Sequence, residues 1–219
     1  MPVHSDISSP VKTFIVKKIL ILVTLAVAVA LGFSAARLWL KPQPIELEAA
    51  TWFGDQARKL PAFELTDHNH KAFNNRSLQG KWTLMFFGYT HCPDICPDTL
   101  QVLADTMRQI DNEAIRQQLQ IVFISVDPER DTLDAMKAYV SYFNPAFLSA
   151  TADIDQVKLL TDAVGVLHYI VKSDEDDRYE VAHSAVMPLI DPKGRYTAIF
   201  SAPHDSEMIA ADLKRLIQP

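Results

Sequence analysis

An uninterrupted run of 18 uncharged residues, Ile19 to Ala36, is the feature that most restricts how this chain of 219 residues can fold. As a helix rising about 1.5 Å per residue, the run spans roughly 27 Å, close to the hydrocarbon thickness of a bilayer. Lysines precede the run, and Arg37 and Trp39 follow it, as is typical of residues at a membrane interface. We therefore expect a transmembrane anchor over residues 19–38 rather than a buried helix of a globular core.

The orientation of this anchor follows from the charges around it. Three lysines precede the run, while the two basic residues after it are soon opposed by glutamates, so the positive-inside rule places residues 1–18 in the cytoplasm. These residues lack arginine and include Asp6, unlike an organellar transit peptide. We expect a single-pass protein of a bacterial inner membrane with its C-terminal domain in the periplasm. A cleaved signal peptide is the alternative, because Ala28–Ala30 and Ser34–Ala36 resemble cleavage sites.

An acidic globular domain is expected after the anchor. Residues 1–41 carry five basic and one acidic side chain, which leaves 16 basic and 26 acidic for the remainder. An acidic surface repels phosphate, so we expect no nucleic-acid partner. We expect a linker over residues 39–60 and one domain over residues 61–219, long enough to bury a core without disulfides. The four consecutive acids Asp174–Asp177 are read as a solvated loop, or alternatively as a docking surface for a basic partner.

Short apolar runs alternate with segments of helical periodicity along this domain. The predicted elements are strands at 83–89, 121–126, 167–171, 186–190 and 196–200, a hairpin around 67–70, and helices at 97–119, 132–143, 154–164 and from Asp205 or Ser206 to 217. This order predicts an α/β fold with a central mixed sheet flanked by helices. Pro188 lacks an N–H for the strand ladder, so it predicts a bulge or a sheet edge.

The only two cysteines share one loop, His91-Cys92-Pro93-Asp94-Ile95-Cys96-Pro97, between a predicted strand and helix. Proline is tolerated in a first helical turn, which makes Asp94 a candidate N-cap. The amides of a helix N-terminus favour thiolates, so Cys92 and Cys96 are suited to redox or metal chemistry. A staple disulfide is the alternative, but closing so short a loop stabilises a fold by only about 2 kcal/mol. A closed zinc site would need four Cys or His ligands.

Two thiolates in one loop form a soft pair that selects Cu(I), and a third, nitrogen ligand would allow Cu(II) as well. His183 is the best candidate for this nitrogen, because adjacent strand ends of an α/β sheet could bring it beside the cysteine loop. His91 is the next candidate, although neighbouring residues rarely point at one centre. The remaining histidines of the domain are read as structural, solvated or capping residues: His68, His70, His168 and His204.

Four segments together closely resemble the Sco/SenC family of copper proteins. They are the cysteine loop with its preceding strand end (Phe87–Pro97), the loop SVDPERDT (Ser125–Thr132), the pair His183-Ser184, and the turn LIDPKG (Leu189–Gly194). In the SVDPERDT loop, Asp131 or Thr132 is expected to cap the helix that follows.

The resemblance implies a thioredoxin-like fold with copper, as Cu(I) and/or Cu(II), held by Cys92, Cys96 and His183. It implies a metallochaperone that delivers copper to, or prepares, the CuA site of cytochrome c oxidase subunit II, or that serves another copper-receiving protein. A periplasmic copper donor and the membrane, through the N-terminal helix, are the further expected partners. Ala182 departs from the family, whose members commonly carry Asp there. The alternative function is a thiol-disulfide oxidoreductase with Cys92 and Cys96 as its catalytic, redox-active pair.

Overall fold

The computed structural model of the chain describes residues 9–39, 46–172 and 179–217. The chain divides into two units, Met1–Pro44 and Ile45–Pro219. The acidic run Asp174–Asp177, for which we expect a solvated loop or a docking surface, lies outside the described residues.

The described residues of the first unit form one helix, α1 (Ser9–Trp39). Its apolar part, Ile15–Ala35, has 21 residues with a mean hydropathy of 2.3, and none of its most apolar stretch is buried. At about 1.5 Å per residue this part measures roughly 31 Å. By length and composition it can cross a membrane, and a signal sequence would have the same features.

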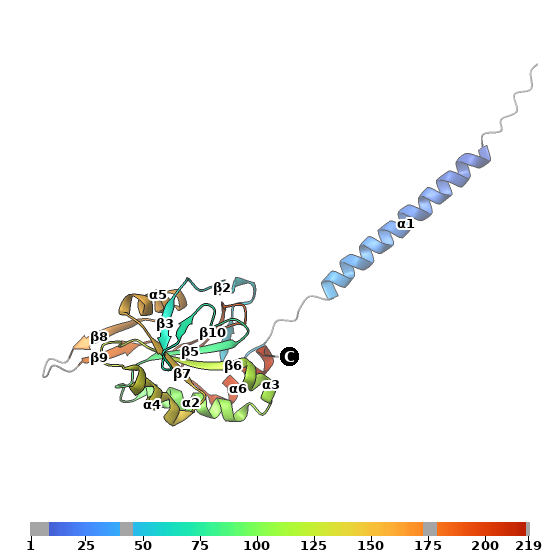
Figure 1. Cartoon of the computed structure of the whole chain (residues 1–219). Coiled ribbons are helices and arrows are strands. Elements are labelled where there is room, and N and C mark those ends of the chain that lie inside the picture. The colour runs from blue at the N-terminus through green and yellow to red at the C-terminus, as the bar shows by residue number, and fades with distance from the viewer. Residues whose placement is uncertain (1–8, 40–45, 173–178, 218–219) are drawn as a thin grey trace, which may run out of the picture. The chain divides into compact units, whose positions relative to one another are not determined.

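The second unit is built on a nine-stranded mixed sheet (Figure 1). The strand order is β1-β11-β10-β5-β6-β7-β3-β4, with β2 also paired to β11; β5, β6 and β7 run parallel and the other pairs antiparallel. The strands are β1 (Ala50–Trp52), β2 (Arg58–Lys59), β3 (Glu64–Asp67), β4 (Ala72–Asn74), β5 (Trp82–Gly88), β6 (Leu119–Ser125), β7 (Leu148–Thr151), β10 (Met187–Ile190) and β11 (Arg195–Phe200). The helices are α2 (Ile95–Gln109), α3 (Glu113–Gln118), α4 (Leu133–Phe143), α5 (Ile154–Val164) and α6 (Ser206–Leu216), with a 3-10 turn at Gly54–Gln56.

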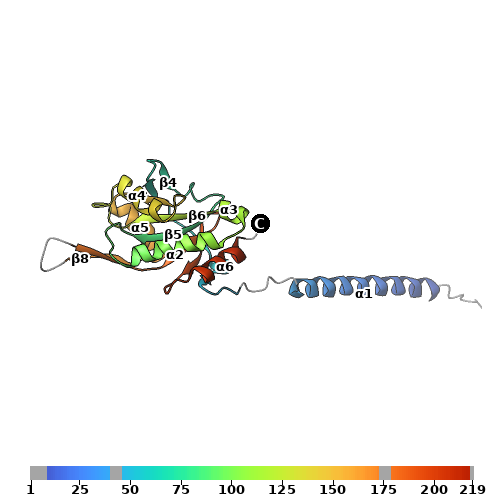
Figure 2. The same cartoon turned by 90° about the horizontal axis from the view of Figure 1, so that it is seen from below.

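Helices cover both faces of this sheet, as the sequence predicted. Along β5, Leu84 and Phe86 face the core shared with α2, α4 and α6, while Met85 and Phe87 face the core shared with α5. The alternation follows from the two-residue period of a strand, and burial of both faces explains why β5 is apolar throughout. Figures 1 and 2 show α2 and α6 on the same side of the sheet.

The folded unit begins earlier than the predicted domain boundary at residue 61. β1 and β2, which lie in the predicted linker, pair with the free edge of β11. The buried carboxylate of Asp212 in α6 accepts hydrogen bonds from the backbone N–H groups of Glu48, Ala49 and Ala50, at 2.9, 2.8 and 2.9 Å. Such pairing depends on partners more than 130 residues away, so short-range patterns in the sequence do not reveal it.

Within the domain, β9 (Tyr179–His183) was not predicted, and two further elements differ from the prediction. The helix expected over 97–119 is divided into α2 and α3, because the Asn112 side chain accepts the Ala114 N–H at 2.9 Å and starts a new helix. Asparagine competes with the helical backbone in this way and favours caps. The short strand β7 was not predicted; its four residues contain one large apolar side chain, and its buried position comes from pairing with β6 and β3.

Pro188 lies in the interior strand β10, so the predicted sheet edge is wrong and the predicted bulge is confirmed. Leu189 pairs with Ala198 and Ile190 with Tyr196, so that Thr197 is skipped in the register. The Thr197 hydroxyl donates to the Leu189 carbonyl at 3.2 Å. An extra residue of this kind bends a strand locally.

A separate two-stranded ribbon consists of β8 (His168–Lys172) and β9 (Tyr179–His183) and extends from one end of the sheet (Figure 1). Within the described strands, β8 and β9 pair only with each other. Val181 is buried, whereas Tyr169 and Ile170 are 65% and 57% exposed. The ribbon is therefore attached to the domain by side-chain contacts and chain connections rather than by a backbone ladder.

Candidate metal centre

The cysteine loop joins the end of β5 to the start of α2. The Cys92 N–H donates to the Tyr89 carbonyl at 3.2 Å, which turns the chain, and Cys96 is the second residue of α2. Asp94 occupies the N-cap position, but its side chain makes no capping hydrogen bond to the described residues. The predicted placement of both thiols at a helix start is therefore correct, while the capping role expected of the Asp94 side chain is wrong.

Cys92, Cys96 and His183 meet at one point, although His183 is far from the cysteines in the sequence. Their potential ligand atoms lie within 4.8 Å of one another, and Cys96 Sγ lies 3.2 Å from His183 Nε2. Cys96 is fully buried, and Cys92 and His183 are partly buried. Two sulfurs and one imidazole nitrogen form the donor set that suits copper in either oxidation state.

Aromatic rings hold the imidazole of His183 in place. The ring packs edge-on against Tyr89, with centroids 6.1 Å apart, and against Phe86 at 6.2 Å. Its Nδ1 lies 3.4 Å from the Ser184 carbonyl oxygen. The tautomer that carries its proton on Nδ1 donates to this carbonyl and leaves the Nε2 lone pair directed toward Cys96.

The two thiols differ sharply in acidity. The hydrogen bond from Cys96 is the main cause that lowers the pKa of Cys92 to about 5, against the opposing effect of burial. The same hydrogen bond and burial raise the pKa of Cys96 well above the ordinary thiol range. The pair therefore carries its first negative charge on the accessible sulfur of Cys92 and retains a proton on Cys96.

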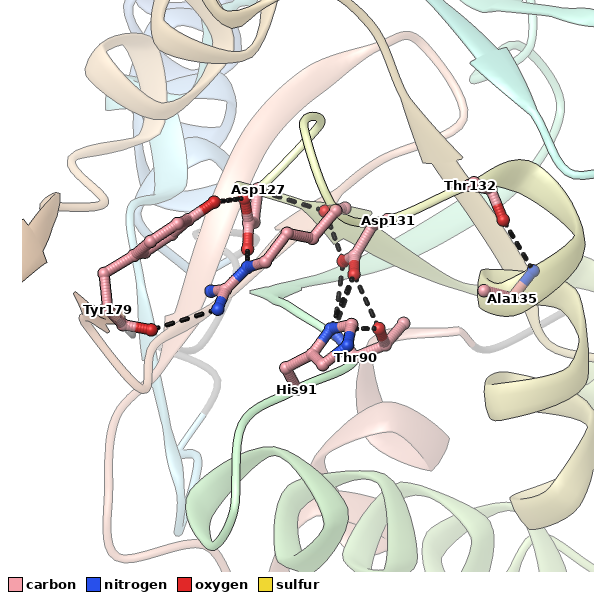
Figure 3. A network of polar contacts seen from close by, with 9 residues as sticks. Thr90, His91, Asp127, Asp131, Thr132, Ala135 and Tyr179 are labelled. Carbon is pink, nitrogen blue, oxygen red and sulfur yellow. Dashed lines mark hydrogen bonds and ion pairs between the residues drawn. The ribbon is translucent and has the colours of Figure 1, made fainter. Parts of the chain in front are cut away.

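A buried carboxylate fixes the start of the cysteine loop (Figure 3). Asp131 accepts the Thr90 hydroxyl at 2.6 Å and the Thr90 N–H at 3.0 Å, and it also accepts the Ser125 hydroxyl at 2.6 Å. The helix-capping role belongs to Thr132, whose Oγ1 accepts the Ala135 N–H at 3.2 Å. The sequence left Asp131 and Thr132 as alternative caps, and only the fold reveals that Asp131 contacts a loop 41 residues away.

The remaining histidines lie outside the three-residue cluster. His91 is exposed, with Nδ1 3.2 Å from Thr90 Oγ1 and 3.7 Å from Asp131 Oδ1. His68 is buried, and its Nδ1 accepts the Ser149 N–H at 3.1 Å. His204 Nε2 lies 2.5 Å from the Ala185 carbonyl. His168 pairs with His183 across the ribbon.

The family follows from the sequence match around this site. A family model described as SCO1/SenC matches residues 54–218, which include the cysteine loop and His183. The chain belongs to the SCO1/SenC family. This membership confirms the predicted family and the thioredoxin-like fold of its members.

Individual SCO1/SenC relatives agree with this assignment. Human "Protein SCO2 homolog, mitochondrial" is 39% identical over 153 residues, which cover 70% of this chain and 58% of the human protein. A "Putative copper-binding protein" of Stutzerimonas stutzeri is 38% identical over 146 residues, covering 67% of this chain and 71% of that protein. The structure of Bradyrhizobium japonicum ScoI with copper bound has 39% sequence identity and a TM-score of 0.63, and covers 72% of this chain and 98% of that chain. Copper is therefore the metal to consider at the three-residue cluster.

Proposed function

We propose that this chain is a membrane-anchored copper metallochaperone that binds one copper ion through Cys92, Cys96 and His183. The observation that carries the proposal is the convergence of these three ligand atoms within 4.8 Å. Copper is the cargo, and its binding displaces the proton that Cys96 retains in the metal-free pair. The thiolate pair suits Cu(I), and the imidazole adds the nitrogen that Cu(II) favours.

Copper stoichiometry tests this assignment. Full-length chain in detergent micelles, reduced and loaded with Cu(I) under anaerobic conditions, is expected to retain about one copper. Because the chain has only two cysteines, Cys92→Ser and Cys96→Ser address all of its thiols. Both variants are expected to lose most of the copper, whereas His68→Ala, outside the cluster, is expected to retain it. Less than about 0.2 copper per wild-type chain would contradict the proposal.

The receiving protein proposed for this copper is cytochrome c oxidase subunit II, at its CuA site, with a periplasmic protein as the copper donor. The solved structure of BsSco is described as that of a member of the Sco family of cytochrome c oxidase assembly proteins, which supports this choice. Mixing the Cu(I)-loaded chain with the reduced soluble domain of subunit II tests it directly. Copper is expected to move to the acceptor and to appear as a CuA spectrum after addition of Cu(II). Copper retained by the chain would favour another acceptor.

The proposed location is a bacterial inner membrane, with α1 as an uncleaved anchor and the copper domain in the periplasm. The length and hydropathy of Ile15–Ala35 and the lysines that precede it support this topology. A reporter that is active only in the periplasm is expected to be active when it is fused after Gln218. The fusion protein is expected to remain with the membrane fraction. A cytoplasmic reporter would contradict the orientation, and a shortened soluble product would indicate a cleaved signal peptide.

Thiol-disulfide exchange is a second candidate function, because the acidities of the two thiols are strongly different. The accessible Cys92 thiolate would attack a partner disulfide, form a mixed disulfide and release one partner thiolate. The Cys96 sulfur, after losing its proton, would then attack Cys92 and release the second partner thiolate. The chain would thereby be oxidised by two electrons and the partner reduced. Reduction of a disulfide substrate that persists in His183→Ala would separate this activity from copper binding.

A further inference from the structure

The ribbon that carries His183 needs an attachment to the domain, because β8 and β9 pair only with each other among the described strands. An isolated two-stranded hairpin is marginally stable in water. Three side chains of β8 are largely exposed, Tyr169, Ile170 and Val171, at 65%, 57% and 45%. Few side chains therefore decide where the ribbon, and with it His183, lies.

Three residues at the far end of β9 from His183 form a compact polar cluster, which we call the latch: Asp127, Arg130 and Tyr179. Figure 3 shows Tyr179 facing Asp127. The Tyr179 hydroxyl donates to Asp127 Oδ1 at 2.8 Å, and Arg130 Nη1 donates to the Tyr179 carbonyl oxygen at 3.0 Å. Arg130 Nε also donates to Asp127 Oδ2. The first residue of β9 is thus held through both its side chain and its backbone.

Two features strengthen the contacts between the residues of the latch. The guanidinium of Arg130 lies 3.7 Å from the centroid of the Tyr179 ring, a cation–π contact. Asp127 is only 4% exposed, so its charge-assisted hydrogen bonds act where water screens them poorly. The hydrogen bonds of the latch, unlike those of an exposed ion pair, therefore restrain the ribbon.

The latch and the cysteine loop are fixed by the same short segment, residues 125–131. Asp131 holds Thr90 at the start of the cysteine loop, while Asp127, four residues earlier, holds Tyr179 at the start of β9. The guanidinium of Arg130 also lies 5.4 Å from the centroid of the Tyr89 ring, which packs edge-on against His183. One loop therefore determines the positions of both the thiol side and the imidazole side of the copper site.

We propose that Asp127, Arg130 and Tyr179 act as positioning residues that hold His183 against Cys96. The inference rests on the copper ligands proposed above. β9 carries the latch at Tyr179 and the imidazole at its other end, about 13 Å away at 3.3 Å per residue, with the buried Val181 between them. Release of the latch lets the ribbon swing, so the imidazole spends less time at the metal while both thiols stay in place. Cu(II), which depends on the nitrogen ligand, loses affinity, and Cu(I), held by the thiolates, is little affected.

Hydrogen exchange on the metal-free full-length chain in micelles tests whether the latch restrains the ribbon. Arg130→Met removes the charge and the hydrogen bonds but keeps the length of the side chain. The amides of β8 and β9 are expected to exchange about tenfold faster in this variant, with β5 unchanged. Tyr179→Phe keeps the ring and the carbonyl and is expected to shift exchange in the same direction by a smaller factor. The matched control is Arg108→Met, which changes an exposed arginine of α2 and is expected to match the wild type.

Competition titrations of Cu(II) and Cu(I) test whether the latch affects the affinity for each copper state. Arg130→Met is expected to weaken Cu(II) binding about tenfold and Cu(I) binding less than about threefold, with a Cu(II) visible spectrum shifted toward that of His183→Ala. Because the latch acts through His183, the double variant Arg130→Met/His183→Ala is expected to bind Cu(II) as tightly as His183→Ala alone.

Each result decides a separate point. Unchanged ribbon exchange in Arg130→Met, or an equal loss of affinity for both copper states, would overturn the latch. A double variant that binds Cu(II) more weakly than His183→Ala would overturn it as well, since the two losses would then be independent. Cu(II) binding untouched by His183→Ala would instead overturn the ligand assignment, and with it the role of the latch in copper binding, whatever the exchange data show.

Discussion

Gly88 leaves room for the sulfur of Cys96: a Cβ atom on Gly88 would lie 2.7 Å from Cys96 Sγ and 3.0 Å from the ring of Phe123. Both neighbours are fully buried and cannot move aside without disturbing the core. The glycine at the end of β5 is therefore required by close packing against Cys96, a proposed copper ligand, rather than by its backbone dihedral angles.

Gly88→Ala is accordingly expected to destabilise the fold by about 1–3 kcal/mol, as overpacking of a core does, and to weaken Cu(I) binding by displacing Cys96. Denaturant unfolding and Cu(I) titration measure the two effects. Gly32→Ala is the control, because the structure places no atom within 4 Å of its Cβ position among the described residues. A Gly88→Ala chain with wild-type stability and affinity would show that the sulfur has space to move.

His183→Ala is expected to weaken Cu(II) binding at least about tenfold and Cu(I) binding much less, because Cu(I) is satisfied by two thiolates and Cu(II) gains more from imidazole. Competition against chelators of known affinity measures both. His91→Ala is the matched control, since His91 is exposed and lies outside the cluster although it adjoins Cys92. A larger loss in His91→Ala than in His183→Ala would reverse the assignment of the third ligand.

The acidity of Cys92 predicts a distinctive pH profile of alkylation. The thiolate is the reacting form, and the pKa of Cys92 is lowered to about 5, against about 8.5 for an ordinary thiol. In the reduced, metal-free chain, the rate of iodoacetamide labelling at Cys92 is expected to fall only as pH drops through about 5. Cys96, buried and with a raised pKa, is expected to react slowly throughout. Mass spectrometry of the labelled peptide separates the two sites.

A variant without the second thiol identifies the cause of this acidity. Cys96→Ala removes the S–H group whose hydrogen bond is the largest contribution to the lowered pKa of Cys92. The inflection of the labelling rate is expected to move toward the ordinary thiol range, above pH 7. An inflection that stays near 5 would assign the effect to the helix N-terminus instead.

Asp212→Ala is expected to destabilise the domain by about 1–3 kcal/mol, because it leaves the N–H groups of residues 48–50 without the buried carboxylate that accepts their hydrogen bonds. Urea unfolding measures this loss. Asp162→Ala serves as the control, since Asp162 is 62% exposed in an ion pair with Lys158, and such pairs contribute about 0–1 kcal/mol. Equal stability of the two variants would mean that water replaces the lost carboxylate.

Local patterns in the sequence determined those elements whose formation depends on residues close together in the chain. The uncharged run of residues 19–36 indicates the apolar part of α1, although the helix itself extends from Ser9 to Trp39. The apolar run of β5 indicates a strand buried on both faces. Gly165 ends α5 at a φ of 76°, and Gly194 closes the β10–β11 turn at 73°, conformations that a residue without a side chain adopts easily. The spacing of Cys92 and Cys96 between a strand and a helix was equally readable, because all of these patterns depend on neighbours in the chain.

Only the tertiary structure determined which distant residues contact those elements. Cys96 and His183 are separated by 87 positions, and Thr90 and Asp131 by 41, so no local periodicity relates them. The motif resemblance implied the ligands but not the latch between Asp127 and Tyr179. It also left open the separation of the ribbon from the main sheet. These features arise when backbone groups and buried charges find partners across the folded domain, and an isolated segment of the sequence contains no trace of a partner that it meets only after folding.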